Sequence, residues 1–216
     1  MRGLALELLL IRHGESTGNV GNLIASPDAP LTPLGIRQAQ ALGKRLAGEG
    51  WEPQRCFASP LARARETAEV IAECMALPPF ETLDDLAELS VGPWGGTPWE
   101  DFARRHPELV VDNGNPLGME WGYPGGETLA QVRERGARAL RFLASFGETD
   151  DRPVIAIAHG TLLTQALSGF LNLPPSPYTQ FSWRNAALAI VFMSDGRPPK
   201  ITRLNDVQHL DCLTEG

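Results

Sequence analysis

The chain has 216 residues, of which 43% are hydrophobic and 21% charged, close to the average of folded globular proteins. This composition excludes a disordered, collagen-like or coiled-coil protein, and the length is that of a single domain over 1–216. The net charge of −7 argues against a nucleic-acid partner, because a phosphate backbone is gripped by a basic face.

The sequence shows no pattern typical of a membrane segment, a signal peptide or a metal site. The most apolar long stretch, 154–171, contains His, Gln, Thr, Ser and Gly and is not typical of a membrane-spanning helix. The three cysteines lack a CxxC spacing, and Asp and Glu do not cluster with His at the spacing of metal ligands. We therefore expect a cytoplasmic protein with no membrane contact, no metal and no cofactor.

The first half of the chain alternates strand and helix patterns. Thr32 followed by Pro33 is typical of a helix N-cap with proline at the first helical position, and Ser59-Pro60 repeats this signature. The predicted elements are a strand over 6–11, a helix over 33–48, a strand over 55–58, a helix opened by Ser59-Pro60, a short helix opened by Thr97-Pro98 and a long loop over 106–126.

The second half repeats the alternation. Its predicted elements are a helix of about 20 residues from Thr128, a strand over 154–158, a helix over 161–172 and strands over 187–192 and 200–204. Continuously apolar strands that alternate with helices are typical of parallel sheets buried on both faces. The pattern therefore indicates a layered α/β fold with a mostly parallel sheet.

Two histidines follow the two best strand candidates. His13 comes after the first strand and His159 after the strand over 154–158, and each is followed by glycine. Since the carboxyl ends of strands form the ligand crevice of an open α/β sheet, these side chains are expected to converge there. Position alone leaves open that they are unrelated loop histidines.

Motifs around both histidines sharpen this expectation. They are, in order, LIRHGES at 10–16, LTPLGIRQA at 31–39, SPLARARETA at 59–68, LAE at 86–88 with GPWGG at 92–96, GGET at 125–128 and AHG at 158–160. In order and spacing they resemble the histidine phosphatase superfamily, whose best-known branch is the cofactor-dependent phosphoglycerate mutases, and most of all its small phosphatase members. The resemblance runs from about residue 7 to residue 210. It implies the phosphoglycerate mutase-like fold, a three-layer α/β/α sandwich.

Hydrolysis of a phosphate monoester needs a nucleophile, cations for the phosphoryl oxygens and an acid for the leaving alkoxide. A neutral imidazole is a competent nucleophile, so we assign this role to His13, whose flanking cations depress its pKa and favour the neutral form. The resemblance places Arg12 and Arg63 on the phosphoryl group, whereas Arg65 is expected to point away from it.

The resemblance also assigns the remaining site residues. It makes His159 a donor to the phosphoryl oxygens and places Gly160 and Asn19 at the same group, with a turn-forming role for Asn19 as the alternative. Glu88 matches the proton donor, and its apolar sequence neighbours would favour its protonated form near neutral pH. The rival acids Glu81, Asp84 and Asp85 are expected to be solvated or to cap helices.

The same site supports a phosphatase, a phosphoglycerate mutase or an inactive phosphate-binding domain. Mutases of this type are usually longer, which favours a phosphatase that acts on a small phosphorylated metabolite. The segment 97–126 is expected to form a lid, which over 106–126 is rich in apolar residues and poor in cations and so favours an apolar or neutral alcohol. Gly95 and Ala158 depart from the usual residues of the family, and this leaves the substrate fit open. The role of Arg104-Arg105 and the choice between monomer and homodimer also stay open.

Overall fold

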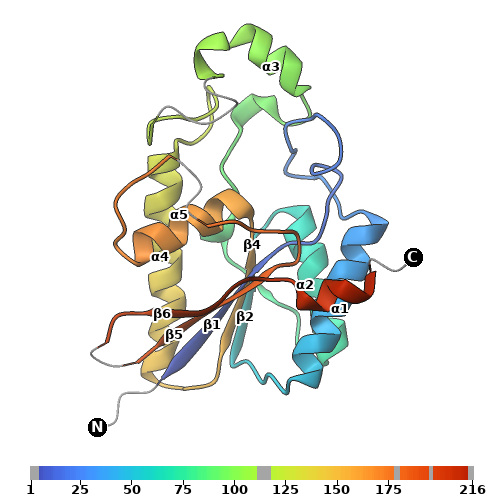
Figure 1. Ribbon diagram of the computed structural model, residues 1–216, viewed down its shortest axis with the longest axis vertical. Helices are drawn as coiled ribbons and strands as arrows, with labels where there is room; N and C mark the ends of the chain where they lie inside the picture. Colours follow the sequence, from blue (N-terminus) through green and yellow to red (C-terminus); the bar gives the residue numbers. More distant parts are fainter. Residues whose placement is uncertain (1–4, 111–117, 178–180, 195–196, 214–216) are drawn as a thin grey trace.

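The computed structural model describes residues 5–110, 118–177, 181–194 and 197–213, which fold around one central sheet (Figure 1). The sheet has six strands in the order β3-β2-β4-β1-β5-β6. Neighbouring strands from β3 to β1 pair in parallel, whereas β5 is antiparallel to both β1 and β6. The strands are β1 (Leu6–Arg12), β2 (Arg55–Ala58), β3 (Glu81–Thr82), β4 (Val154–Ala158), β5 (Leu188–Met193) and β6 (Lys200–Asp206).

Helices cover both faces of this sheet, and Figure 1 shows α4 and α5 on one side and α1 and α2 on the other. A hydrophobic core lies on each face of the sheet, and successive residues of β1 point alternately into the two cores. Leu8 and Leu10 belong to the core under α4 and α5, whereas Leu9 and Ile11 belong to the core under α1 and α2. The three-layer α/β/α sandwich predicted from the sequence is therefore confirmed. The helices are α1 (Pro33–Gly48), α2 (Ala62–Met75), α3 (Trp99–Arg105), α4 (Leu129–Ser145) and α5 (Gly160–Phe170).

Capping residues explain where α1 and α4 begin. Thr32 caps α1, since its hydroxyl accepts a hydrogen bond from the Gly35 N–H, and Thr128 with Gln131 forms a capping box at α4. The cap predicted at Ser59 is wrong. Helix α2 begins only at Ala62, without a side-chain cap, because the Ser59 hydroxyl contacts other groups described below. The short strand β3 was not predicted from the sequence.

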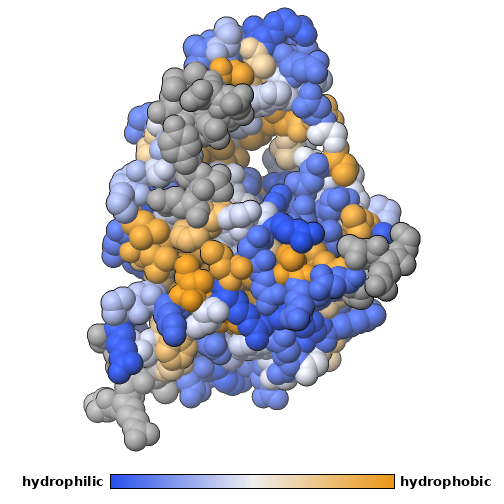
Figure 2. Space-filling view, viewed as in Figure 1, coloured by the Kyte–Doolittle hydropathy of each residue, from blue (hydrophilic) through white to orange (hydrophobic). Residues whose placement is uncertain are grey.

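The segment that carries α3 lies above the sheet at the top of Figure 1. It is tied to the loop after β1, where the Ile24 N–H donates to the Thr97 carbonyl and Leu23 forms a bridge with Pro98. Figure 2 shows a hollow between this segment and the body below it, with apolar side chains along the rim. No helix among the described residues is long and apolar enough to cross a membrane.

Candidate active site

The two histidines that follow β1 and β4 meet at the carboxyl end of the sheet. Parallel pairing of the strands brings His13 beside Ala158, whose carbonyl accepts the His13 backbone N–H at 3.0 Å. The imidazole rings of His13 and His159 lie with their centroids 5.0 Å apart. The predicted convergence of these side chains is therefore confirmed.

His13 is held as a neutral ring whose lone pair lies on Nε2. Its Nδ1 lies 2.6 Å from the Gly14 carbonyl oxygen, to which it donates, and its Nε2 accepts from Arg63 Nε at 3.2 Å. Burial, then the charge of Arg63 and then that of Arg12, lower the pKa of His13 to about 3, although the Gly14 carbonyl opposes this. Burial thus contributes more than the flanking cations on which the sequence argument relied.

Two guanidinium groups surround this ring. Arg63 is only 4% exposed and also donates to the Ser26 carbonyl, whereas Arg12 donates to the Trp183 carbonyl. Burial lowers the pKa of both groups and the nearby Glu88 carboxylate raises it, but a guanidinium remains charged in either case. Arg12 Nε is buried and has no acceptor among the described residues. Two positive charges therefore converge beside His13, while Arg65 is exposed, as expected.

His159 is fully buried and contacts a serine that the sequence argument had treated only as a helix cap. Its Nε2 lies 2.7 Å from the Ser59 hydroxyl, which in turn accepts the Leu61 N–H at 3.2 Å. A serine hydroxyl has two lone pairs and one proton, so Ser59 can donate to Nε2 or accept from it, and the contact is compatible with either neutral tautomer of the ring. Burial, followed by the influence of His13, Arg63 and Arg12, keeps the pKa of His159 well below its usual value. Nδ1 has no partner within the described part of the chain.

Glu88 lies at the N-terminus of α5 rather than in an apolar setting. Its Oε1 accepts the N–H groups of Leu89 and Leu162 at 3.0 and 2.9 Å, and its Oε2 accepts that of Thr161 at 3.2 Å. The apolar neighbours expected from the sequence do not describe this environment fully, because three backbone N–H groups contact the carboxyl oxygens.

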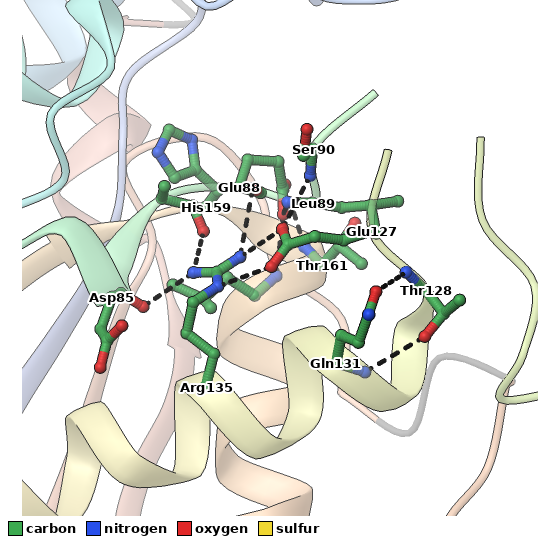
Figure 3. Close-up of polar contacts among 12 residues, drawn as sticks. Asp85, Glu88, Leu89, Ser90, Glu127, Thr128, Gln131, Arg135, His159 and Thr161 are labelled. Atoms are coloured by element: carbon green, nitrogen blue, oxygen red, sulfur yellow. Dashed lines mark hydrogen bonds and ion pairs between the residues drawn. The ribbon is translucent and has the colours of Figure 1, made fainter. Parts of the chain in front are cut away.

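The loop that carries Glu88 is held by a partly buried ion pair between Arg135 of α4 and Glu127, which precedes this helix (Figure 3). The Arg135 guanidinium donates to the carbonyls of Asp85 and Ala87 at 2.9 Å and reaches that of Glu88 at 3.4 Å. The same group makes two hydrogen bonds to the Glu127 carboxylate, at 2.8 and 2.7 Å.

Glu127 completes this connection between α4 and the acid-bearing loop. Burial opposes its charge, but hydrogen bonds from Arg135 and from the Ser90 N–H outweigh this and lower the pKa of Glu127. The sequence argument missed Arg135, and it quoted Glu127 only as a letter of the GGET motif. Neither residue carries a separate signal in the sequence.

Asn19 and Gly160 lie at the edges of the site. The Asn19 side-chain oxygen accepts from Ser16 and from Asn185 Nδ2 at 3.0 Å, so the turn-forming role is present and only its amide N–H groups are left to face a ligand. Asn185, which also donates to the His13 carbonyl, is a further residue that sequence reasoning missed. Gly160 packs beside the Arg12 guanidinium, where an added Cβ would make ordinary contact at 3.6 Å.

A cavity of about 490 Å³ adjoins these groups, with Arg12 and Glu88 in its wall. Trp121 and Tyr123 of the segment predicted as a lid also line it. The doublet Arg104-Arg105 does not, since Arg104 pairs with Asp101 and Arg105 lies over the Trp94 ring. The predicted lid residues Val111 and Leu117 lie outside the described residues. Within the described ranges, no three His, Cys, Asp or Glu side chains are grouped so that they could hold a metal ion.

Comparison with known proteins shows which family and which solved structures this chain is similar to. The histidine phosphatase superfamily (branch 1) matches residues 8–207. A metal-independent phosphoserine phosphatase of Arabidopsis thaliana is 32% identical, over 96% of this chain and 84% of that protein. A probable phosphoglycerate mutase GpmB of Yersinia enterocolitica is 31% identical, over 86% and 84% of the two chains. A mutant phosphoserine phosphatase of Entamoeba histolytica, solved with phosphoserine, superposes with a TM-score of 0.75 at 25% identity, over 95% and 99%.

Proposed function

The chain belongs to branch 1 of the histidine phosphatase superfamily, and from this premise we propose that it is a metal-independent phosphomonoester hydrolase that forms a phosphohistidine at His13. The proposed substrate is a small phosphorylated metabolite. The reaction needs no cofactor, because the two guanidinium groups of Arg12 and Arg63 supply the positive charge that the phosphoryl oxygens require.

One observation carries the proposal. The Gly14 carbonyl holds the proton of His13 on Nδ1, and a pKa of about 3 keeps the ring neutral, so Nε2 bears an available lone pair at neutral pH. The Arg63 N–H that points at Nε2 occupies the place of an electrophile and can move to a phosphoryl oxygen when an ester binds. A histidine with only a structural role would not need this arrangement.

In the proposed first step, Nε2 of His13 forms a bond to phosphorus while the bond from phosphorus to the ester oxygen breaks. Glu88 gives its proton to that oxygen, and the alcohol leaves. In the second step a water oxygen attacks the same phosphorus and the phosphorus–nitrogen bond breaks. The Glu88 carboxylate takes a proton from this water, and inorganic phosphate leaves with His13 restored.

Proton uptake by Glu88 is coupled to binding in this scheme. Without ester, its carboxyl oxygens accept hydrogen bonds from three backbone N–H groups. A bound phosphate ester brings negative charge against that carboxylate, and like charges in one site favour the protonated form of one of them. The acid is therefore generated where and when the leaving alkoxide needs it.

A phosphatase is favoured over a mutase by the charges of the cavity. A mutase must hold the carboxylate of its sugar acid beside the phosphoryl group, yet Arg12 is the one cation among the described residues that line this cavity. Arg104 and Arg105, which could have played that part, are engaged outside it. An inactive binding domain is disfavoured because His13, Arg12, Arg63, His159 and Glu88 are all present.

The decisive test is the hydrolysis of p-nitrophenyl phosphate in excess EDTA. We expect turnover by the native chain and a loss of at least about 10⁴-fold in kcat for His13→Ala, because a missing nucleophile costs a factor of this order. His106→Ala, which removes a histidine of the α3 segment, is the matched control and is expected to retain turnover. Acid-labile, alkali-stable label from a ³²P-labelled ester should be trapped on the native chain and not on His13→Ala.

Two outcomes would contradict the proposal. Turnover that survives in His13→Ala would exclude a phosphohistidine at this residue. Absence of turnover, together with transfer of the phosphoryl group between glycerate positions, would identify a mutase instead.

A further inference from the structure

The motif LTPLGIRQA has no part in the proposed reaction, yet the structure places it against the turn that carries the nucleophile. It forms the start of α1, where Thr32, Gly35 and Gln38 follow one another at a spacing of three residues. This spacing brings them to one face of the helix. Thr32 and Gln38 both form hydrogen bonds with Glu15. This face of α1 therefore packs against the turn that follows β1.

The helix and the turn touch through their backbones. A Cβ added to Gly14 would lie 2.5 Å from the Gly35 carbonyl oxygen, and one added to Gly35 would overlap the carbonyl oxygen of Glu15. Space thus requires glycine at both positions, which is typical of a close approach between two backbones. The Thr32 N–H donates to the Glu15 carbonyl at 2.9 Å. No side chain separates the start of α1 from this turn.

One peptide group of the turn controls the His13 ring. In the trans peptide between Gly14 and Glu15, the carbonyl and the N–H point in opposite directions. The Gly14 carbonyl accepts the Nδ1 proton of His13 at 2.6 Å, and the Glu15 N–H donates to Gln38 Oε1 at 2.8 Å. Among the described residues, these are the two hydrogen bonds of this peptide. Gln38 therefore fixes, from the opposite end, the carbonyl that holds the His13 proton.

The preceding peptide, between His13 and Gly14, has other anchors. Its N–H donates to Thr67 Oγ1 of α2 at 3.1 Å, and its carbonyl accepts from the Ala186 N–H at 3.0 Å and from Asn185 Nδ2 at 3.3 Å. These contacts fix the backbone of the nucleophile. They do not fix the next peptide, because glycine between the two permits a wide range of backbone dihedrals. The peptide after Gly14 needs an anchor of its own.

The reaction depends most on this anchor when an ester is bound. In the free protein, the Arg63 N–H that points at Nε2 favours the same tautomer of His13 as the Gly14 carbonyl does. In the proposed first step, Arg63 moves to a phosphoryl oxygen and Nε2 faces phosphorus. The Gly14 carbonyl then has to keep the proton on Nδ1 without this help. If the carbonyl turned away, the proton could move to Nε2, and the nucleophilic lone pair would be lost.

We propose that Gln38 is a positioning residue for the nucleophile. By accepting the Glu15 N–H, it orients the Gly14 carbonyl, and this carbonyl keeps the lone pair of His13 on Nε2. Gln38 acts through the peptide and not on the ester. The inference rests on the proposed function, because it takes His13 as the nucleophile.

Nuclear magnetic resonance of the full chain tests the contact without turnover. The Nδ1–H of His13, identified by its loss in His13→Gln, is expected as a downfield imidazole resonance protected from solvent exchange. Gln38→Met removes the acceptor and keeps the length of the side chain, so it should speed this exchange roughly ten-fold. Gln38→Glu retains an acceptor oxygen and should preserve the signal. Gln40→Met, which alters an exposed glutamine of the same helix, is the matched control.

Single-turnover kinetics with p-nitrophenyl phosphate tests whether the contact serves the reaction. Gln38→Met should lower the rate of phosphohistidine formation roughly ten-fold, because a misplaced nucleophile attacks slowly. The inhibition constant of inorganic phosphate should stay within about two-fold, since Arg12 and Arg63 still bind the phosphoryl group. The rate is a first-order constant, so a smaller folded fraction lowers the amplitude and not the rate. Gln38→Glu should recover most of the rate, and Gln40→Met should not change it.

Three outcomes would overturn the inference. They are an unchanged Nδ1–H exchange rate in Gln38→Met, an unchanged rate of phosphohistidine formation in that variant, and losses in Gln38→Glu or Gln40→Met as large as those in Gln38→Met. Failure of the proposed function is a separate result. If the native chain hydrolyses no ester, the exchange of the Nδ1–H still shows whether Gln38 orients the carbonyl that holds His13.

Discussion

The two halves of the candidate site are built in different ways. The phosphoryl half, with His13, His159 and Arg63, stands on the ends of strands and the first turn of α2, where backbone pairing fixes each position. The acid half is Glu88 on a loop that follows the two-residue strand β3. Side chains from α4 and the first N–H groups of α5 hold this loop in place. In the proposed mechanism the sheet therefore positions the phosphoryl group, whereas Arg135, Glu127 and the first N–H groups of α5 position the proton donor.

Replacement of Glu88 tests this division with the largest expected effect. Glu88→Gln should lower kcat for alkyl phosphates by about 10²-fold or more, because general acid catalysis is worth a factor of this size. Hydrolysis of p-nitrophenyl phosphate should fall much less, since nitrophenolate leaves without a proton. The measurement is the ratio of the two rates, and Asp84→Asn, an exposed acid on the same loop, is the control.

Equal losses on both substrates would show that Glu88 acts on the phosphoryl half. An effect of Asp84→Asn as large as that of Glu88→Gln would move the acid to Asp84. Either result would break the separation of the site into two halves.

The phosphoryl half was the more predictable from sequence. Apolar runs over 6–11 and 154–158 locate the strands, and a parallel sheet then brings His13 and His159 to one edge. The sequence did not reveal that Ser59 belongs to this half of the site. Its position before proline suggests a helix cap, but its hydroxyl makes a hydrogen bond with the His159 ring. Local sequence indicates what a serine can cap but not which distant imidazole competes for it.

The acid half was predictable only as a residue and not as an environment. The apolar residues on either side of Glu88 suggest an apolar pocket, but two of the three N–H groups that contact its carboxylate come from α5, more than seventy positions later. Arg135 is one of several arginines on α4, and no pattern distinguishes it from Arg138, which pairs with Asp85 at the surface. Contacts that depend on tertiary packing leave no periodic signal in the chain.

Acid sensitivity is expected to come from the phosphoryl half. The native pKa of His13 is about 3, whereas an unfolded histidine titrates near 6.5, so the unfolded chain binds the proton between these values. Stability is then present above pH 6.5 and is lost as the pH falls toward 3. Between pH 7 and pH 5 this histidine should account for a fall of about 2 kcal/mol in the free energy of unfolding.

Urea unfolding of the native chain and of His13→Gln at the two pH values measures this share. The variant should lose about 2 kcal/mol less than the native chain between pH 7 and pH 5, while His159 and His209, whose pKa values burial also lowers, account for part of the remainder. The same pH dependence in both proteins would show that His13 is not held neutral.

The ion pair between Arg135 and Glu127 gives the smallest and most specific effect. Arg135→Gln should lower kcat for alkyl phosphates by roughly ten-fold while p-nitrophenyl phosphate is spared, because the change releases the loop that positions Glu88. Arg138→Gln removes an exposed ion pair to Asp85 on the same loop and is the matched control, with no expected change in the alkyl-to-aryl ratio.

Thermal unfolding alone cannot distinguish a positioning role from a structural one, since loss of this partly buried ion pair and of its hydrogen bonds to the loop destabilises the protein in either case. The alkyl-to-aryl ratio can, because a general loss of folded enzyme lowers both rates equally. In the double variant Glu88→Gln with Arg135→Gln, the second change should add almost nothing to the alkyl loss, as expected when one residue acts through the other. Additive losses would mean that Arg135 contributes to catalysis by a route that does not pass through Glu88.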